Sequence, residues 1–311
     1  ICLPMKTERG CCGYIFLGGK RSESSYNLEE IELLKLLADQ AARGIEHMNL
    51  ASEAAEKEKL RRELEIGRQI QQNLLPSSLP AIPGLEIAAI NSPAMEVGGD
   101  FYTFIHYDRR KLGIIVGDII GKGVAGALNM AATISSLRLI AEESTSVTEA
   151  LQRLNRYLVK NTTKRSFAAV LFAILDLDEG VLRWSNAGLP DPVYVPRQGK
   201  VHYLESEEYA LPPGASMHSA YMENRIKISR GDSVVLVSDG CVETRPNSGH
   251  GEDYGYDRLL DFVERNRQRG PSELVEVLRN DIHDFRGSMQ LEDDFTAVAF
   301  RLIRLENGSA E

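Results

Sequence analysis

The pattern of apolar and polar positions divides the chain into one long helical stretch and a later region of short apolar runs. No proline interrupts residues 28–75, and apolar residues recur there at three- and four-residue spacing, as on one face of an amphipathic helix. Asn27 is a suitable N-cap, and Glu29 and Glu30 follow it in the first turn, where the helix dipole favours negative charge. The spacing therefore predicts a near-continuous helix up to Pro76.

A helix of this length cannot bury an apolar face against itself. Pairing with a second copy would bury the stripe, so we expect a coiled-coil linker over residues 28–76 in a homodimer. A single solvated connector helix is the alternative.

After Pro76, Pro80, Pro83 and Gly84 the apolar runs become short, as in strands separated by turns. The expected strands are residues 85–91, 101–107, 112–116, 167–177, 181–186, 221–228, 233–238 and 295–303, with a short pair around Val193 and Val201. Helices are expected at 124–143, 147–160, 256–267 and 271–286, and a long loop at Cys241–Gly255. Because strands and helices come in runs instead of strict alternation, the order favours an α+β fold with antiparallel sheets over a Rossmann fold.

The first twenty residues hold two short apolar runs, around Ile1–Met5 and Gly13–Leu17, which predict a hairpin. The second run and the helical segment Tyr26–Leu50 (YNLEEIELLKLLADQAARGIEHMNL) resemble the C-terminal end of a GAF sensory domain. Residues 1–27 are therefore expected to be the remnant of such a domain. The chain begins within an apolar stretch, which is typical of a fragment of a longer protein.

Two aspartates stand at the ends of the stretch VGGDFYTFIHYDRRKLGIIVGD, residues 97–118. Asp100 precedes the first apolar run of this stretch and Asp118 follows the second. If the two runs pair as a hairpin, both carboxylates lie at the same end. Carboxylates that close repel one another unless a cation lies between them, so the hairpin predicts a metal site.

Two further apolar runs also meet an aspartate, at Asp239 and at Asp293 or Asp294. A single aspartate is common at a strand end, because its side chain favours turns, so the argument lies in the set. Carboxylates without histidine or cysteine partners suit Mg²⁺ or Mn²⁺ better than Zn²⁺. Two such ions about 3.5–4 Å apart can activate a water molecule and clamp a phosphoryl group. No serine lies in a GxSxG motif, so the sequence offers no hydrolase nucleophile of that kind.

Composition narrows the classes of function. The net charge is −9 and there is no long basic run, which argues against nucleic-acid binding. The four cysteines form no CxxC pair and the six histidines no HExxH motif, so zinc is disfavoured and a reduced, cytoplasmic protein is expected. No apolar run is long enough to span a membrane, and the N-terminus is not a signal peptide.

Five motifs then occur in order. They are VGGDFY at 97–102, GDIIGKGVAGAL at 117–128, NAG at 186–188, SDGCVET at 238–244 and DDFTAV at 293–298. Together they resemble the PPM-type metal-dependent serine/threonine phosphatases, in the bacterial branch that includes SpoIIE and RsbU. The resemblance spans about residues 75–305, and it implies a phosphatase domain at 77–306 with an α-β-β-α sandwich and two metal ions, Mn²⁺ or Mg²⁺.

The resemblance also implies roles for individual residues. Asp118 is expected to bridge the two ions, and Asp100 to lie beside the second ion; these two are the expected catalytic residues. The backbone carbonyl of Ile119 is an expected ligand, and Asp239 and Asp293 are expected to hold the other ion. Asp293 aligns with the first residue of the family's last motif, so it is preferred over Asp294.

The expected reaction is hydrolysis of phosphoserine or phosphothreonine on a protein. By resemblance, the substrate is a phosphorylated STAS-domain anti-anti-sigma protein, and an upstream sensor regulates the reaction through the linker helix. A catalytically silent dimeric scaffold that recruits such regulators is the alternative, and a two-metal phosphodiesterase or nuclease is a second one. The loop Cys241–Gly255 is either a flap over the site or an ordinary surface loop.

Overall fold

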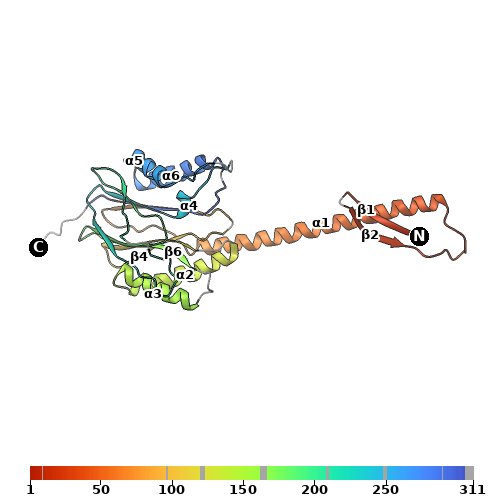
Figure 1. Ribbon diagram of the computed structural model, residues 1–311, viewed down its shortest axis with the longest axis horizontal. Coiled ribbons are helices and arrows are strands. Elements are labelled where there is room, and N and C mark those ends of the chain that lie inside the picture. The colour runs from red at the N-terminus through yellow and green to blue at the C-terminus, as the bar shows by residue number, and fades with distance from the viewer. Residues whose placement is uncertain are drawn as a thin grey trace. The chain divides into compact units, whose positions relative to one another are not determined.

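The computed structural model describes residues 1–8, 10–95, 97–119, 123–161, 167–207, 210–247, 251–288 and 290–304. The chain forms two compact units, residues 1–65 and residues 66–311, and the boundary between them falls inside one helix, α1 (Leu28–Gln72) (Figure 1). This uninterrupted helix is the one expected from the sequence. Pairing of two such helices remains a prediction.

The first unit contains a hairpin and the N-terminal part of α1. Strands β1 (Cys2–Thr7) and β2 (Gly10–Phe16) pair in antiparallel fashion, which confirms the expected hairpin. At the start of α1, the Asn27 side chain accepts a hydrogen bond from the Glu30 backbone N–H, and the Glu30 carboxylate accepts one from the Asn27 N–H, both at 2.8 Å. This reciprocal cap satisfies two backbone donors and fixes the helix start where the sequence predicts it.

The second unit holds ten strands and five helices among its described residues, besides the end of α1. Its strands are β3 (Leu85–Ser92), β4 (Phe101–His106), β5 (Lys111–Ile119), β6 (Ala168–Asp176), β7 (Val181–Ala187), β8 (Val193–Val195), β9 (His202–Tyr203), β10 (Asn224–Lys227), β11 (Ser233–Val237) and β12 (Phe295–Leu302). Its helices are α2 (Gly123–Glu143), α3 (Val147–Asn161), α4 (Asp239–Val242), α5 (Tyr256–Asn266) and α6 (Pro271–Arg286).

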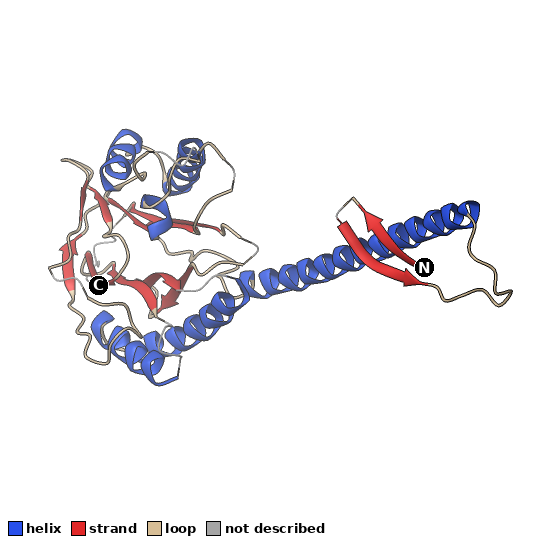
Figure 2. Cartoon of the chain, turned by 45° about the vertical axis from the view of Figure 1, so that its right-hand side comes forward, coloured by secondary structure: helices blue, strands red, loops and turns tan. Residues whose placement is uncertain are grey.

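These strands form two antiparallel sheets that face one another. One sheet has the order β10-β7-β6-β5-β4 and the other the order β3-β12-β11-β8-β9. Helices α2 and α3 cover the outer face of the first sheet, and α5 and α6 cover the second, as Figure 2 shows. The architecture confirms the expected α+β sandwich of two antiparallel sheets flanked by helices.

Three apolar clusters hold the layers together. One lies between the sheets, with Leu171, Leu236 and Phe300 among its buried members. The other two lie between each sheet and its helices, where buried aliphatic residues of α3 and α6 meet the sheets. Burial of apolar surface on both sides of each sheet explains why β5, β6, β11 and β12 read as nearly continuous apolar runs.

The β4–β5 hairpin fixes the relative positions of two aspartates. Phe101 lies opposite Gly117 in the register, so Asp100, which comes just before β4, and Asp118, which follows Gly117 in β5, lie at the same end of the hairpin. The Phe101 ring packs over Gly117, where a Cβ would stand 2.4 Å from the ring. The hairpin predicted from the sequence is therefore confirmed, and glycine at 117 is required by the ring beside it.

Two local predictions were wrong. Asp239 does not end the strand before a loop but begins the one-turn helix α4, so the loop starts after Val242. The strand expected at residues 221–228 is shorter, because only β10 pairs with β7 and Tyr221 is instead buried in the core beneath α2 and α3. Within the described residues, no helix is long and apolar enough to cross a lipid bilayer.

Candidate metal centre

Three carboxylates from different elements converge at one end of the two sheets. Asp100 precedes β4, Asp118 lies near the end of β5, and Asp239 is the first residue of α4. One carboxylate oxygen from each lies within 4.8 Å of the others. These residues are far apart in the sequence, and the structure brings them together as the sequence predicts.

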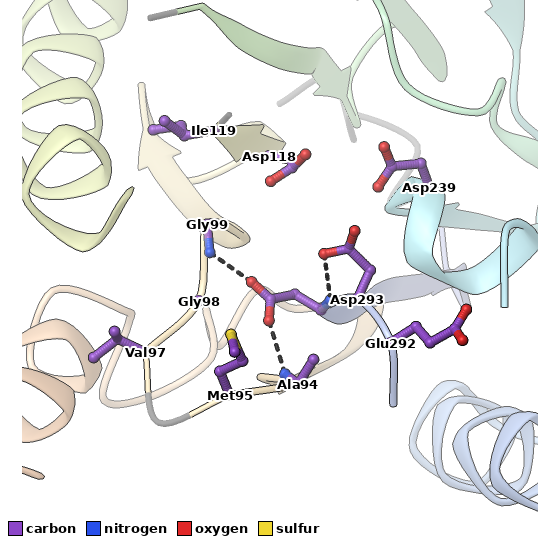
Figure 3. Close-up of a pocket in the computed structure, with 11 residues that line it drawn as sticks. Ala94, Met95, Val97, Gly98, Gly99, Asp118, Ile119, Asp239, Glu292 and Asp293 are labelled. Atoms are coloured by element: carbon purple, nitrogen blue, oxygen red, sulfur yellow. Dashed lines mark hydrogen bonds between the residues drawn. The ribbon is translucent and has the colours of Figure 1, made fainter. Parts of the chain in front are cut away.

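A cavity of about 250 Å³ opens beside this cluster. Its wall includes Asp118, Asp239 and Asp293, and Figure 3 shows the carboxylate of Asp293 pointing toward the other two. Glu292 and Asp294 bring the acidic residues of the wall to five. Among the described lining residues there is no lysine or arginine, so no side chain there neutralises these charges.

Asp100 is the most buried member of the cluster. It is 3% exposed, and its Oδ2 atom makes no hydrogen bond with the described residues. Burial, followed by the neighbouring charges of Asp118 and Asp294, raises the pKa of Asp100 well above its usual range. A buried carboxylate oxygen without a partner is costly, and a cation beside it would remove that cost.

The half-buried carboxylates are perturbed in the same direction. Burial and the charges of Asp239 and Asp293 raise the pKa of Asp118 to about 7. Burial and the charges of Glu243 and Asp293 raise the pKa of Asp239 to about 6. A set of repelling carboxylates with no histidine or cysteine among them fits a hard divalent cation such as Mg²⁺ or Mn²⁺.

The backbone at Ile119 faces the same place. Its side chain is buried among apolar residues, whereas its carbonyl oxygen lies 2.5 Å from where a Cβ on Gly99 would stand. The Oδ1 atom of Asp118 lies 2.7 Å from the same position. The carbonyl and the carboxylate thus converge on Gly99, and glycine there leaves room for both. This placement favours the expected role of the Ile119 carbonyl, which remains a prediction.

The adjacent aspartates 293 and 294 have different environments. Both line the cavity, but Asp293 is exposed, whereas Asp294 is buried and its carboxylate accepts hydrogen bonds from backbone amides of the segment before β4. The geometry therefore favours Asp293 as a metal ligand, as the motif alignment suggests. The sequence does not reveal what Asp294 does, because a partner two hundred residues away cannot be read from local pattern.

The loop after α4 is anchored near its start. The Thr244 hydroxyl donates to the Gly240 carbonyl at 2.6 Å, and the Arg286 guanidinium donates to the Arg245 carbonyl at 2.9 Å. Residues 248–250 of this loop lie outside the described residues. Residues 120–122, which belong to the motif at 117–128, also lie outside them. A flap role for this loop stays a prediction.

Comparison with known proteins gives consistent results. Residues 108–303 match the family model described as Stage II sporulation protein E (SpoIIE). The chain is 28% identical over 244 residues to Phosphoserine phosphatase RsbU of Bacillus subtilis (strain 168), covering 78% of this chain and 71% of the relative. It is 30% identical over 268 residues to Protein IcfG of Synechocystis sp. (strain ATCC 27184 / PCC 6803 / Kazusa), covering 77% of this chain but only 41% of that protein.

Solved structures show the same fold. The SiaA-PP2C domain of Pseudomonas aeruginosa superimposes with a TM-score of 0.69 at 22% identity, covering 80% of this chain and 99% of that one. The PP2C phosphatase domain of SpoIIE from Bacillus subtilis, solved with a fragment of its regulatory domain, gives 0.59 at 22% identity, covering 71% and 64%. The matched part of the chain therefore has the PP2C fold.

Proposed function

Since this chain belongs to the SpoIIE family and carries a PP2C-type serine/threonine phosphatase domain, we propose that it hydrolyses phosphoserine or phosphothreonine on a regulatory protein, using divalent metal at the carboxylate cluster. The observation that carries the proposal is the convergence of Asp100, Asp118 and Asp239 around a cavity with no cationic side chain among its described lining residues. Such a cluster is stable as a set of anions only when cations neutralise it.

Each acidic residue has a distinct place in this mechanism. The charge of Asp118 acts on Asp100, and the charges of Asp239 and Asp293 act on Asp118, so Asp118 would be the carboxylate that both ions share. Asp100 and the Ile119 carbonyl would complete one site, and Asp239 and Asp293 the other. When bound, two divalent ions supply a water nucleophile at neutral pH and offset the negative charge of the phosphoryl oxygens. The described lining residues include no serine, cysteine or histidine, which supports direct attack by water.

The test is phosphate release from phosphoproteins with and without added metal. We expect release from a phosphoserine protein in Mn²⁺ or Mg²⁺, none after chelation, and little hydrolysis of nucleic acids or other phosphodiesters. Faster cleavage of diesters would favour the nuclease alternative. Binding of a phosphoprotein without hydrolysis in either metal would favour the silent scaffold.

We place the substrate among phosphorylated STAS-domain anti-anti-sigma proteins. Support comes from the motif resemblance to the SpoIIE and RsbU branch and from relatives that are themselves named phosphoserine phosphatases, RsbU and RsbP. The chain covers 46% of RsbP and 24% of Stage II sporulation protein E, so much of each relative has no counterpart here. A panel of phosphorylated STAS proteins against unrelated phosphoserine proteins measures this preference directly.

Regulation through α1 is supported by contacts that its last turn and the residues just after it make within the second unit. The Gln71 side chain is buried; its amide donates to the Gly98 carbonyl, and its Oε1 atom accepts from the Gly98 N–H at 3.1 Å. Arg138 of α2 donates to the Leu74 carbonyl at 2.7 Å and to Thr103 of β4 at 2.9 Å. The end of the helix is thus attached to the segment that carries Asp100. We propose that a sensor and a paired linker act on the site through this attachment.

Insertions in the linker test this mechanism. Two residues inserted within Ala51–Lys59 would turn the ends of the helix by about 200° relative to each other, whereas seven residues would change their phase by only about 20°. We expect the two-residue insertion to change phosphatase activity and the seven-residue insertion to leave it near that of the parent. Sedimentation equilibrium on the same proteins measures whether the linker pairs. Equal activity in all three would contradict regulation through a stiff helix.

A further inference from the structure

We propose that Asp294 is a positioning residue that holds the segment before β4 so that Asp100 faces the metal cluster. The inference rests on the proposed function, because it concerns the same metal centre. It assigns to Asp294 a task distinct from that of its neighbour Asp293: binding backbone amides instead of a metal ion.

The hydrogen bonds of Asp294 carry the argument. Its Oδ1 atom accepts from the Ala94 N–H at 2.8 Å. Its Oδ2 atom accepts from the Gly99 N–H at 2.5 Å and from the Asp100 N–H at 3.3 Å. Asp294 is only 7% exposed, so water competes weakly for these hydrogen bonds. Hydrogen bonds to an ionised acceptor are stronger than neutral ones, and one carboxylate here fixes three amides of a single segment.

Only a carboxylate can make all of these contacts. Both of its oxygens accept hydrogen bonds, whereas asparagine would place an NH₂ group against either the Ala94 amide or the amides of Gly99 and Asp100. Replacing Asp294 by asparagine, a change of almost no volume, therefore removes the hydrogen bonds of one of its two oxygens. The segment that orients Asp100 would then be held less firmly.

The segment is built to fit this carboxylate. A Cβ on Gly98 would stand 2.3 Å from Oδ2 of Asp294, so a side chain at 98 would displace the carboxylate from its amides. Asp294 is itself held in place just before β12. The Asn91 side chain donates to the Thr296 hydroxyl at 2.8 Å and to the Asp100 carbonyl at 3.3 Å, which ties β3, β12 and the segment together. The two ends of the attachment are thus fixed independently of any metal.

The experiment compares Asp294→Asn with the matched variant Asp293→Asn, one residue earlier. Amide hydrogen exchange of residues 97–100 is measured in the metal-free proteins, and Mn²⁺ binding is measured by calorimetry. Neither readout depends on hydrolysis. Phosphate release is then followed as a function of Mn²⁺ concentration.

For Asp294→Asn we expect faster exchange at Gly99 and Asp100, and Mn²⁺ affinity lower by about 10- to 100-fold, as for other residues that orient a ligand. Activity should return in large part at high Mn²⁺, because every ligand is still present. For Asp293→Asn we expect unchanged exchange in the metal-free protein, weaker Mn²⁺ binding and activity that high Mn²⁺ does not restore.

Several outcomes would overturn the inference. Unchanged exchange and unchanged Mn²⁺ affinity in Asp294→Asn would show that the attachment has no effect. Unchanged exchange with activity lost at all Mn²⁺ concentrations would make Asp294 a ligand. Rapid exchange of the Gly99 amide in the metal-free parent would also refute it, without any variant. If the parent shows slow exchange and binds Mn²⁺ but hydrolyses no phosphoprotein, the proposed function fails while the positioning role stands.

Substitution of Gly98 tests the contact between Gly98 and the Asp294 carboxylate from the glycine side. Gly98→Ala should displace the carboxylate and reproduce the faster exchange and weaker Mn²⁺ binding of Asp294→Asn. In an Asp294→Ala background the clash is absent, so the added effect of Gly98→Ala should be small. Additive effects of these two substitutions would contradict direct contact between the two residues.

Discussion

Replacing Asp118 with asparagine is expected to lower phosphate release from a phosphoserine protein by on the order of 1,000-fold or more. Asp118 lies within the carboxylate cluster together with Asp100 and Asp239, and an amide in its place removes one charge and presents an NH₂ group to any ion. Calorimetry should show weaker Mn²⁺ binding in the same variant. The metal-free protein should unfold at the same or a higher temperature, because the substitution removes a charge that burial and Asp239 disfavour.

Asp178→Asn is the matched control. It makes the same change of charge at a side chain that is 69% exposed and forms an ion pair with Arg110, on the turn between β6 and β7. Exposed pairs of this kind contribute little to stability, so both activity and unfolding temperature should stay near the parent values. Substantial hydrolysis by Asp118→Asn with undiminished Mn²⁺ affinity would remove the basis for the metal centre.

Gly240→Ala is expected to reduce activity by roughly 100-fold through displacement of the backbone beside Asp239. A Cβ at this position would stand 2.0 Å from the backbone carbonyl oxygen of Asp294. The obstacle is main chain just before β12 instead of a flexible side chain, so α4 and the 293–294 segment must move apart. Asp239 and Asp293, two neighbouring carboxylates that line the cavity, would then separate. Overpacking of this kind costs about 1–3 kcal/mol of unfolding free energy, which thermal or urea unfolding measures.

Gly270→Ala is the corresponding control. It lies just before α6, and a Cβ there would meet no atom within 4 Å. Its activity should equal that of the parent, with at most a small change in unfolding temperature. Full activity in Gly240→Ala would mean that the close approach of α4 to Asp294 is unimportant for the site.

The parts of the fold that sequence pattern predicts well are local. The β4–β5 hairpin follows from two apolar runs on either side of a polar turn, and that hairpin alone brings Asp100 and Asp118 to one end. The first turn of α1 follows from Asn27 and the glutamates after it, and the structure shows the reciprocal cap. In each case the interacting residues are close in sequence, so the pattern contains the information.

The pairing of strands that are far apart in the sequence could not be predicted from the local pattern of apolar and polar residues. Nothing in residues 85–92 indicates that β3 would lie beside β12, more than two hundred residues later. The turn of helix at Asp239 was missed because four residues are too few to show a helical period. The attachment of Asp294 to the Ala94 and Gly99 amides could not be predicted for the same reasons. It lies where β12 pairs with β3 and where α4 comes close to the Asp294 backbone.

The place of β12 between two other strands of its sheet has a consequence for synthesis of the protein. Since β12 lies between β3 and β11, both of these strands have an unpaired edge until residues 295–302 have left the ribosome. Asp293 also emerges only at that stage. With Asp293 as a metal ligand, as we propose, the nascent chain would have no complete metal centre until then, and its open strand edges are exposed to chaperones or to wrong pairing with other chains during the same period.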